Sequence, residues 1–153
     1  MNELSQSIEI SASPDEVFSV ITDLPAMGRL SPENTGGEWL NGARGAAVGA
    51  KFKGTNVHGA KSWTTTVTVV DFSPPHAFAF EVNVGPAKVA RWEYAVEATG
   101  TGSRVTESWM DRRNGLSKWI GGKSSGVARR DEFTVQSIQT TLENLKKTLE
   151  KTQ

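Results

Sequence analysis

Hydrophobic residues in the last part of the chain recur with the period of an α-helix. Spacings of three, four and eight residues separate Val127, Val135, Ile138, Leu142, Leu145 and Leu149. Residues three or four apart lie on one face of a helix. The pattern predicts a long helix over about 126–151, and its apolar stripe needs a partner that buries it.

Before this helix, apolar and polar residues mostly alternate, which is typical of strands with one buried face. Glycine, proline and small polar residues separate these stretches by short connections, as between neighbouring antiparallel strands. The sequence predicts seven strands, over 5–11, 39–40, 50–58, 61–72, 76–84, 88–98 and 103–112.

A short helix is predicted after the first strand. Ser13 suits the N-cap, Pro14 the first helical position, and Glu16 completes a capping box with Ser13, while Pro25 ends the apolar pattern. Residues 26–30 are expected to add a further short turn. We interpret 33–37 as a turn-rich loop and 41–49 as a flexible connection.

These elements define the expected fold class, α+β. A curved antiparallel sheet of about seven strands wraps around a long C-terminal helix, with short helices after the first strand. The middle of the chain lacks the strand–helix alternation of a doubly wound parallel sheet. No internal repeat or linker divides the sequence, so we expect one domain over 1–153.

The period of two assigns each strand an inward face, taken as the side with the larger apolar area. Gly54 on that face leaves space, and the neighbouring inward Asn56 adds hydrogen-bonding capacity. The full inward set is Phe52, Gly54, Asn56, His58, Trp63, Thr65, Val67, Val69, Phe78, Phe80, Val82, Trp92, Tyr94, Val96, Val105, Glu107 and Trp109.

Glu107 is the acidic residue of this set, and a buried carboxylate is costly unless it is paired or protonated. The sequence allows three environments for the Glu107 carboxylate: an apolar cavity, an ion pair with an arginine, or water at the open end of the sheet. A mostly apolar hollow with a few polar groups is typical of a small-molecule site. The candidate ligand-binding residues are Phe52, Asn56, Trp63, Thr65, Phe80, Trp92, Tyr94, Glu107, Trp109 and Asp131.

Asp131 is included because it falls on the apolar stripe of the long helix. The alternative is a first-turn acid favoured by the helix dipole. Phe133 falls off the stripe, so the early part of this helix is expected to contact more than the sheet.

The composition excludes several function classes. Lysine plus arginine equals aspartate plus glutamate, 17 each, which gives no electrostatic argument for nucleic acid or an anionic membrane. There is no cysteine, so disulfides and thiolate chemistry are absent. Neither a signal peptide nor a run long enough to span a membrane is visible. We therefore expect a cytoplasmic protein without a membrane span.

Known cofactor and metal motifs are not matched. His58 and His76 lie on different predicted strands without a third ligand at useful spacing. The run from Gly121 to Ser124 lacks the earlier glycine of a phosphate-binding loop, since Ser117 stands there. We expect no metal and no cofactor.

Several segments, spread over almost the whole chain, resemble the START/Bet v1-like (SRPBCC) helix-grip superfamily. Within it, the chain is similar to the polyketide cyclase/dehydrase branch of small bacterial proteins. The segments are Ile8-x-Ile10-x-Ala12-x-Pro14-x-Glu16-Val17-Phe18, Phe52-x-Gly54-x-Asn56, Trp63-x-Thr65, Arg91-Trp92-x-Tyr94 and Gly102-x-Arg104-Val105-Thr106-Glu107-Ser108-Trp109. The resemblance implies the fold; the superfamily includes cyclases, dehydratases, lipid carriers and hormone binders.

Three functional hypotheses follow. The first is binding of a small hydrophobic or aromatic molecule, with aromatic walls and with Asn56 and Glu107 as polar anchors. The second is a polyketide cyclase/dehydratase-like enzyme: Glu107 would remove a proton next to a carbonyl, and Asn56 or Tyr94 would hydrogen-bond the enolate oxygen. The third is a protein-interaction domain whose hollow is filled by its own tryptophans. The sequence leaves the ligand and the oligomeric state open.

Overall fold

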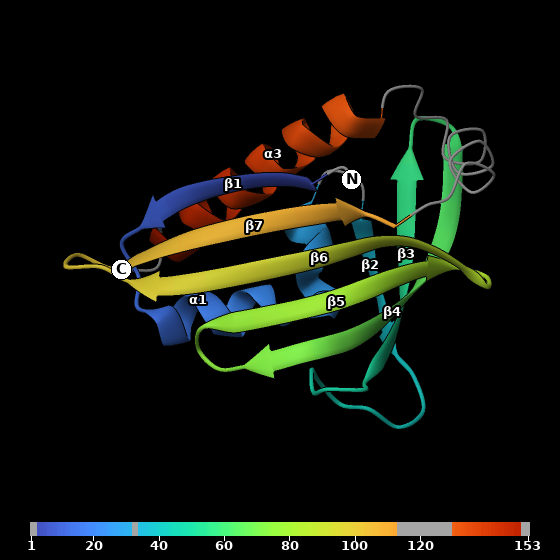
Figure 1. Ribbon diagram of the computed structural model, residues 1–153, viewed down its shortest axis with the longest axis horizontal. Helices are drawn as coiled ribbons and strands as arrows, with labels where there is room; N and C mark the ends of the chain where they lie inside the picture. The colour runs from blue at the N-terminus through green and yellow to red at the C-terminus, as the bar shows by residue number, and fades with distance from the viewer. Residues whose placement is uncertain (1–2, 32–33, 113–129, 151–153) are drawn as a thin grey trace.

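The computed structural model describes residues 3–31, 34–112 and 130–150. Seven antiparallel strands form one sheet in the order β1-β7-β6-β5-β4-β3-β2 (Figure 1). The strands are β1 Glu3–Ile10, β2 Asn34–Trp39, β3 Lys51–His58, β4 Lys61–Ser73, β5 Ala77–Val84, β6 Ala87–Ala98 and β7 Ser103–Asp111. The predicted strand count and antiparallel arrangement are confirmed.

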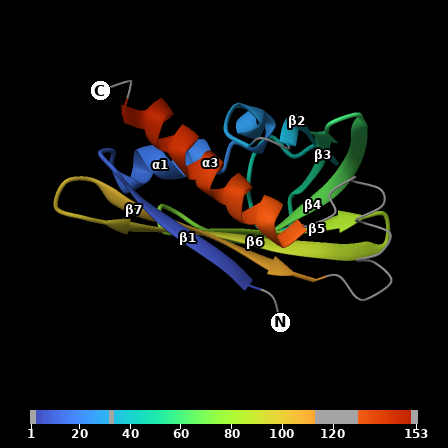
Figure 2. The same ribbon diagram turned by 90° about the horizontal axis from the view of Figure 1, so that it is seen from above.

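The long helix α3 (Arg130–Glu150) crosses the concave side of the curved sheet, and β2, β3 and β4 curl up beside it (Figure 2). It packs mainly on β1 and also on β7, while the 3₁₀ helix η1 (Leu24–Arg29) packs on β2. A sheet that holds one helix in its hollow was the expected architecture.

The buried face of α3 includes Ile138, Leu142, Leu145 and Leu149, as the helical spacing predicts. The predicted first residues of the helix, including Val127, lie outside the described residues. The side chain of Phe133 also lies outside the described residues. The other end is anchored to the start of the chain, because Lys146 Nζ donates to the Glu9 carbonyl at 2.9 Å and to Glu150 at 2.7 Å.

The short helix α1 (Pro14–Ile21) begins as its sequence predicts. The Ser13 hydroxyl accepts from the Glu16 amide at 3.2 Å, and the Glu16 carboxylate accepts from the Ser13 amide at 3.1 Å, so the capping box is formed. Val17 and Phe18 are buried on the apolar face of the helix. The predicted turn over 26–30 is part of η1, which starts two residues earlier.

The prediction of a loop over 33–37 was wrong, because β2 occupies most of it. A Cβ on Gly37 would lie 2.0 Å from the Lys53 carbonyl oxygen of β3, so glycine there permits close backbone approach and does not mark a turn. The β2–β3 register shifts between Asn34 and Gly36, where glycine adopts a positive φ of 109°. A strand with two glycines and a bulge lacks the alternation on which the prediction depended.

The predicted inward faces agree with the observed burial. Phe52, Val69, Phe78, Val96 and Val105 are almost fully buried, and their strand neighbours are more exposed. The concave face of the sheet is therefore the core face, and the candidate site is built on it.

Candidate functional site

Strand pairing places a mixed polar and aromatic row across the concave face. Glu107 of β7 pairs with Gln6 of β1 on one side and with Tyr94 of β6 on the other, and Tyr94 pairs with Phe78 of β5. Directly opposed residues share one face of the sheet. One carboxyl group, one phenol and one amide thus come from three neighbouring strands.

Glu107 is only 3% exposed, and its two oxygens differ. The Tyr94 hydroxyl donates to Oε2 at 2.9 Å, whereas Oε1 is buried and has no hydrogen-bond partner among the described residues. Within the described residues Glu107 has no arginine partner, and its burial excludes a position in water at the open end of the sheet. The ion-paired arginines of the sheet, Arg91 and Arg104, belong to its outer face.

Burial controls the protonation of this pair. Desolvation raises the pKa of Glu107 to about 8, against a smaller lowering by the hydrogen bond from Tyr94. The pKa of Tyr94 is raised well above its usual value by burial, then by the Glu107 charge and hydrogen bond. At pH 7 the neutral form of the carboxyl group is therefore favoured.

Replacing Tyr94 by phenylalanine is expected to raise the pKa of Glu107 further, because the hydrogen bond that lowers it is lost. An NMR titration of protein with carbon-labelled glutamate measures this. The Thr65→Val variant also removes a buried hydroxyl but on another strand, so it should leave the Glu107 titration unchanged. A Tyr94→Phe variant with an unshifted Glu107 would contradict the pairing.

Aromatic rings surround the pair. Phe78 lies against Tyr94 with ring centroids 6.5 Å apart and an interplanar angle of 25°, and Phe80 packs on Phe78 at 5.5 Å. In the next row of the sheet, the partly buried Trp92 pairs with the buried Trp109. The carboxyl group thus lies in an apolar, mostly aromatic environment.

Asn56 belongs to a second polar group. Its Nδ2 donates to Thr65 Oγ1 at 3.2 Å, and both side chains are buried. Thr65 is seven residues before Phe72, the β4 member of the Glu107 row, a span of roughly 23 Å along the strand. The structure therefore does not bring Asn56 to Glu107, although both face the hollow.

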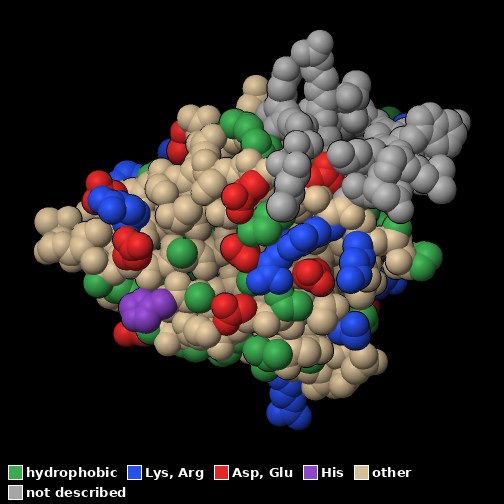
Figure 3. All heavy atoms as spheres, in the orientation of Figure 1, with side chains coloured by type: hydrophobic (Ala, Val, Ile, Leu, Met, Phe, Trp, Pro, Cys, Tyr) green, Lys and Arg blue, Asp and Glu red, His purple; other side chains and the backbone are tan. Residues whose placement is uncertain are grey.

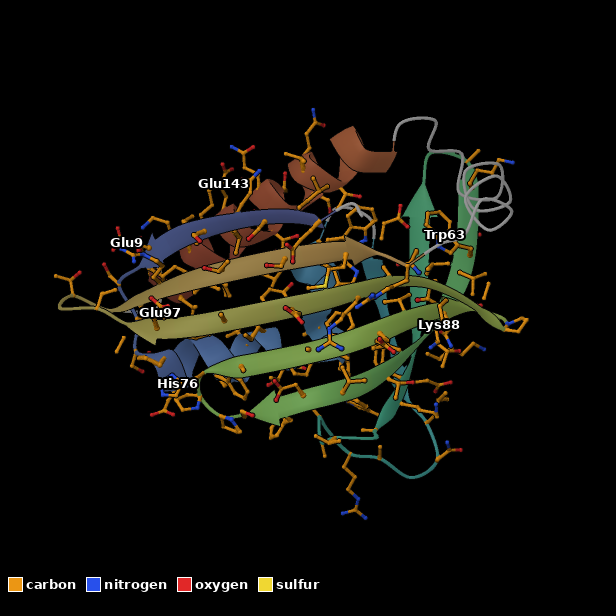
Figure 4. The ribbon with its side chains drawn as sticks, viewed as in Figure 1. Glu9, Trp63, His76, Lys88, Glu97 and Glu143 are labelled. Atoms are coloured by element: carbon orange, nitrogen blue, oxygen red, sulfur yellow. The ribbon has the colours of Figure 1, made fainter. Side chains whose placement is uncertain are left out.

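The remaining candidates divide between these two regions. Trp63, the register partner of Asn56, is half-buried at the far end of β3 and β4 (Figure 4). Phe52 is buried against Trp39, with ring centroids 5.3 Å apart. The side chain of Asp131 lies outside the described residues.

Two sets of polar residues were missed by the sequence reasoning. Gln6 lies opposite Glu107, and the alternation of β1 with Ile8 and Ile10 was the available signal. On α3, the hydroxyl residues Thr134, Ser137 and Thr141 are buried although polar. Their spacing of three and four was visible in the sequence beside the apolar stripe.

This hydroxyl stripe continues to Asn144, whose Nδ2 donates to the Leu30 carbonyl at 2.8 Å. Leu30 directly follows η1. The stripe is therefore directed, at this end, towards η1, next to the face of α3 that packs on β1.

A hollow of about 160 Å³ lies on the outer face of the sheet, lined by Asp71, Ala77, Phe78, Ala79, Glu93, Tyr94, Ala95, Thr106 and Ser108. Its acids are already engaged: Ser73 donates to Asp71 at 2.8 Å and Arg91 to Glu93 at 2.7 Å. Figure 3 shows acidic and basic side chains interspersed over this face. These features do not distinguish it as a ligand site.

Metal-ligating side chains do not cluster in the part of the chain that the structure describes. His76 Nδ1 instead hydrogen-bonds the Val96 carbonyl at 3.0 Å, and the side chain of His58 lies outside the described residues. No helix within 3–31, 34–112 or 130–150 is long and apolar enough to span a membrane.

The antiparallel sheet closed around its C-terminal helix defines the chain as a helix-grip protein. It belongs to the family described as polyketide cyclase/dehydrase and lipid transport, whose model matches residues 1–150. A comparison with curated proteins found no match.

Solved structures support the fold. The solution structure of a polyketide-cyclase-like protein from Corynebacterium glutamicum is 28% identical, with a TM-score of 0.66 over 97% of this chain and 91% of that one. The di-domain ARO/CYC StfQ from the steffimycin biosynthetic pathway has a TM-score of 0.75 at 10% identity, over 97% of this chain and 50% of that one. The Aha1 dimer from Colwellia psychrerythraea has a TM-score of 0.65 at 14% identity, covering 98% and 97%. At these identities the last two likenesses concern the fold alone.

Proposed function

We propose that this protein binds a small hydrophobic or aromatic molecule between the concave face of the sheet and α3. The observation that carries the proposal is Glu107, a carboxyl group buried among aromatic rings whose Oε1 has no partner in the part of the chain that the structure describes. A buried polar atom without a partner costs about 1–3 kcal/mol. A ligand that hydrogen-bonds Oε1 recovers this cost, and the surrounding rings supply apolar contact.

The comparisons support the proposal at the level of a class of ligands. The family description includes lipid transport as well as cyclase and dehydrase activity. Both imply a predominantly apolar small molecule.

Native mass spectrometry of the protein purified from its host tests the proposal. We expect a mass increment of a small organic molecule that disappears in denaturing solvent. A protein that carries no molecule, and whose tryptophan fluorescence is unchanged by apolar aromatic probes, would contradict ligand binding. That result would favour an interaction domain with its hollow filled by its own aromatic side chains.

A cyclase or dehydratase-like activity is the second candidate, favoured by the Glu107 pKa of about 8. Once ionised, such a carboxylate is a stronger base than an exposed one and removes a proton next to a ligand carbonyl. Tyr94 is the neighbour that holds this carboxylate in place. Asn56 lies on β3 and bonds Thr65 of β4, too far along the sheet from the Glu107 row to serve the same reacting centre.

Under this second candidate, Glu107→Gln should abolish turnover of a polyketone substrate and leave its affinity largely intact, because the shape and the Tyr94 contact are kept. Glu93→Gln makes the same change on the outer face of β6 and is the matched control. Steady-state kinetics and equilibrium binding measure the two effects separately. Unchanged turnover in Glu107→Gln would remove this residue from the mechanism.

A further inference from the structure

The hydrogen bond from Tyr94 determines which oxygen of Glu107 is left for a ligand. The Tyr94 hydroxyl donates a hydrogen bond to Oε2, so Oε2 acts as an acceptor within the protein. Oε1 is buried and unpartnered among the described residues. A proton on a carboxyl group at this position therefore belongs on Oε1, where it is available to a bound molecule.

No described cation stabilises the ionised form of Glu107. From β1, the inward residues are Leu4, Gln6, Ile8 and Ile10, and from β6 they are Trp92, Tyr94 and Val96. From α3, the buried residues are Thr134, Ser137, Ile138, Thr141, Leu142, Leu145 and Leu149.

Tyr94 is the titratable group of these sets. Lys146 of α3 is engaged elsewhere, with Glu150 and the Glu9 carbonyl. A buried carboxyl group without a cationic partner favours its neutral form.

We propose that Glu107 meets its ligand as a neutral carboxylic acid that donates a hydrogen bond from Oε1. The ligand group at this point is then an acceptor, such as a ketone or quinone carbonyl, and not an amine or another cation. Tyr94, Glu107 and the ligand oxygen form a chain in which each group donates to the next. The raised pKa of Glu107 supports the neutral state near pH 7.

This inference rests on the proposed binding function and specifies which polar group of the ligand the site prefers. An anionic Glu107 would attract amines and repel acceptor-only groups, whereas a neutral acid prefers carbonyl oxygens. Three naphthalenes of the same shape separate these cases: acetylnaphthalene, isopropylnaphthalene and naphthylethylamine. They present an acceptor, an apolar group and a cation, respectively, at the same position.

Binding of the three probes is measured by tryptophan fluorescence or calorimetry near pH 6.5. We expect acetylnaphthalene to bind roughly threefold to tenfold more tightly than isopropylnaphthalene, the ratio expected from one additional hydrogen bond. Naphthylethylamine should bind more weakly than both. The ketone preference should fall as the pH rises through about 8, where Glu107 loses its proton.

Two variants at one position complete the test. In Glu107→Gln the amide oxygen still accepts from Tyr94 and the amide N–H₂ replaces the acid proton, so the ketone preference should persist and become independent of pH. Glu107→Leu should bind acetylnaphthalene and isopropylnaphthalene equally. Thermal melts of both variants verify that they are folded.

The possible failures are distinct. If isopropylnaphthalene and acetylnaphthalene both fail to bind the native protein, the proposed function fails. If both bind equally, or the amine binds most tightly, ligand binding stands and the neutral-donor role of Glu107 is overturned. A ketone preference that Glu107→Leu retains would also overturn it.

Discussion

Relative to the native protein, the Glu107→Gln variant is expected to gain stability as the pH rises from about 4.5 to about 8, and then to hold that gain. The pKa of a glutamate carboxyl group is ordinarily 4.5, and burial raises the pKa of Glu107 to about 8 in the folded protein. Between these values the folded state binds more protons than the unfolded state, so native stability falls with rising pH. Glutamine cannot titrate and lacks this contribution.

The expected difference is a few kcal/mol at pH 9, since each unit of pKa shift corresponds to about 1.4 kcal/mol. Urea unfolding at a series of pH values measures it, and the difference between the two proteins cancels all titrations that they share. Near pH 4.5 the two should be about equally stable. Glu93→Gln, on the outer face, is the control for the removal of one carboxyl group that is not buried. A Glu107→Gln curve parallel to the native one would mean that the carboxyl group is not desolvated in solution.

The period of two was sufficient to direct Glu107 inwards, because alternation is a property of one strand. Its partner was not predictable in the same way. The Tyr94–Glu107 contact depends on the register between β6 and β7, and the turn over 99–102 has several possible registers. The alternation also places Asn56 on the same face as Glu107. The strand register, which the alternation does not give, puts the two residues in distant rows.

Other differences between the predicted and the observed structure arise because the prediction takes apolar residues to mark the core. Thr134, Ser137 and Thr141 of α3 are buried, yet they count as polar in a hydrophobic pattern. Gly37 lies in β2 because of a close backbone contact, yet glycine counts as a turn signal. Strong periodic elements were thus predicted well, whereas residues chosen for space or for hydrogen bonding were not.

Gly102→Ala is expected to destabilise the protein by about 3 kcal/mol, because the added methyl group has no space. A Cβ on Gly102 would lie 2.1 Å from the Ile10 carbonyl oxygen and 2.9 Å from the Ala12 amide nitrogen, both backbone atoms. The next residue fixes the same junction, since Ser103 Oγ donates to the Ala12 carbonyl at 2.7 Å. The end of β1 and the start of β7 would have to separate.

Gly100→Ala in the same turn is the matched control, because nothing lies within 4 Å of its added Cβ. Its stability should change by less than about 0.5 kcal/mol. Thermal melts should show a loss of roughly 6–12 °C for Gly102→Ala alone, at about 2–4 °C per kcal/mol for a chain of this size. Because Glu107 of β7 pairs with Gln6 of β1, the Gly102→Ala variant should also disturb this row and lower the affinity for an aromatic ketone. Equal stability of the two alanine variants would place β1 and β7 further apart than this packing requires.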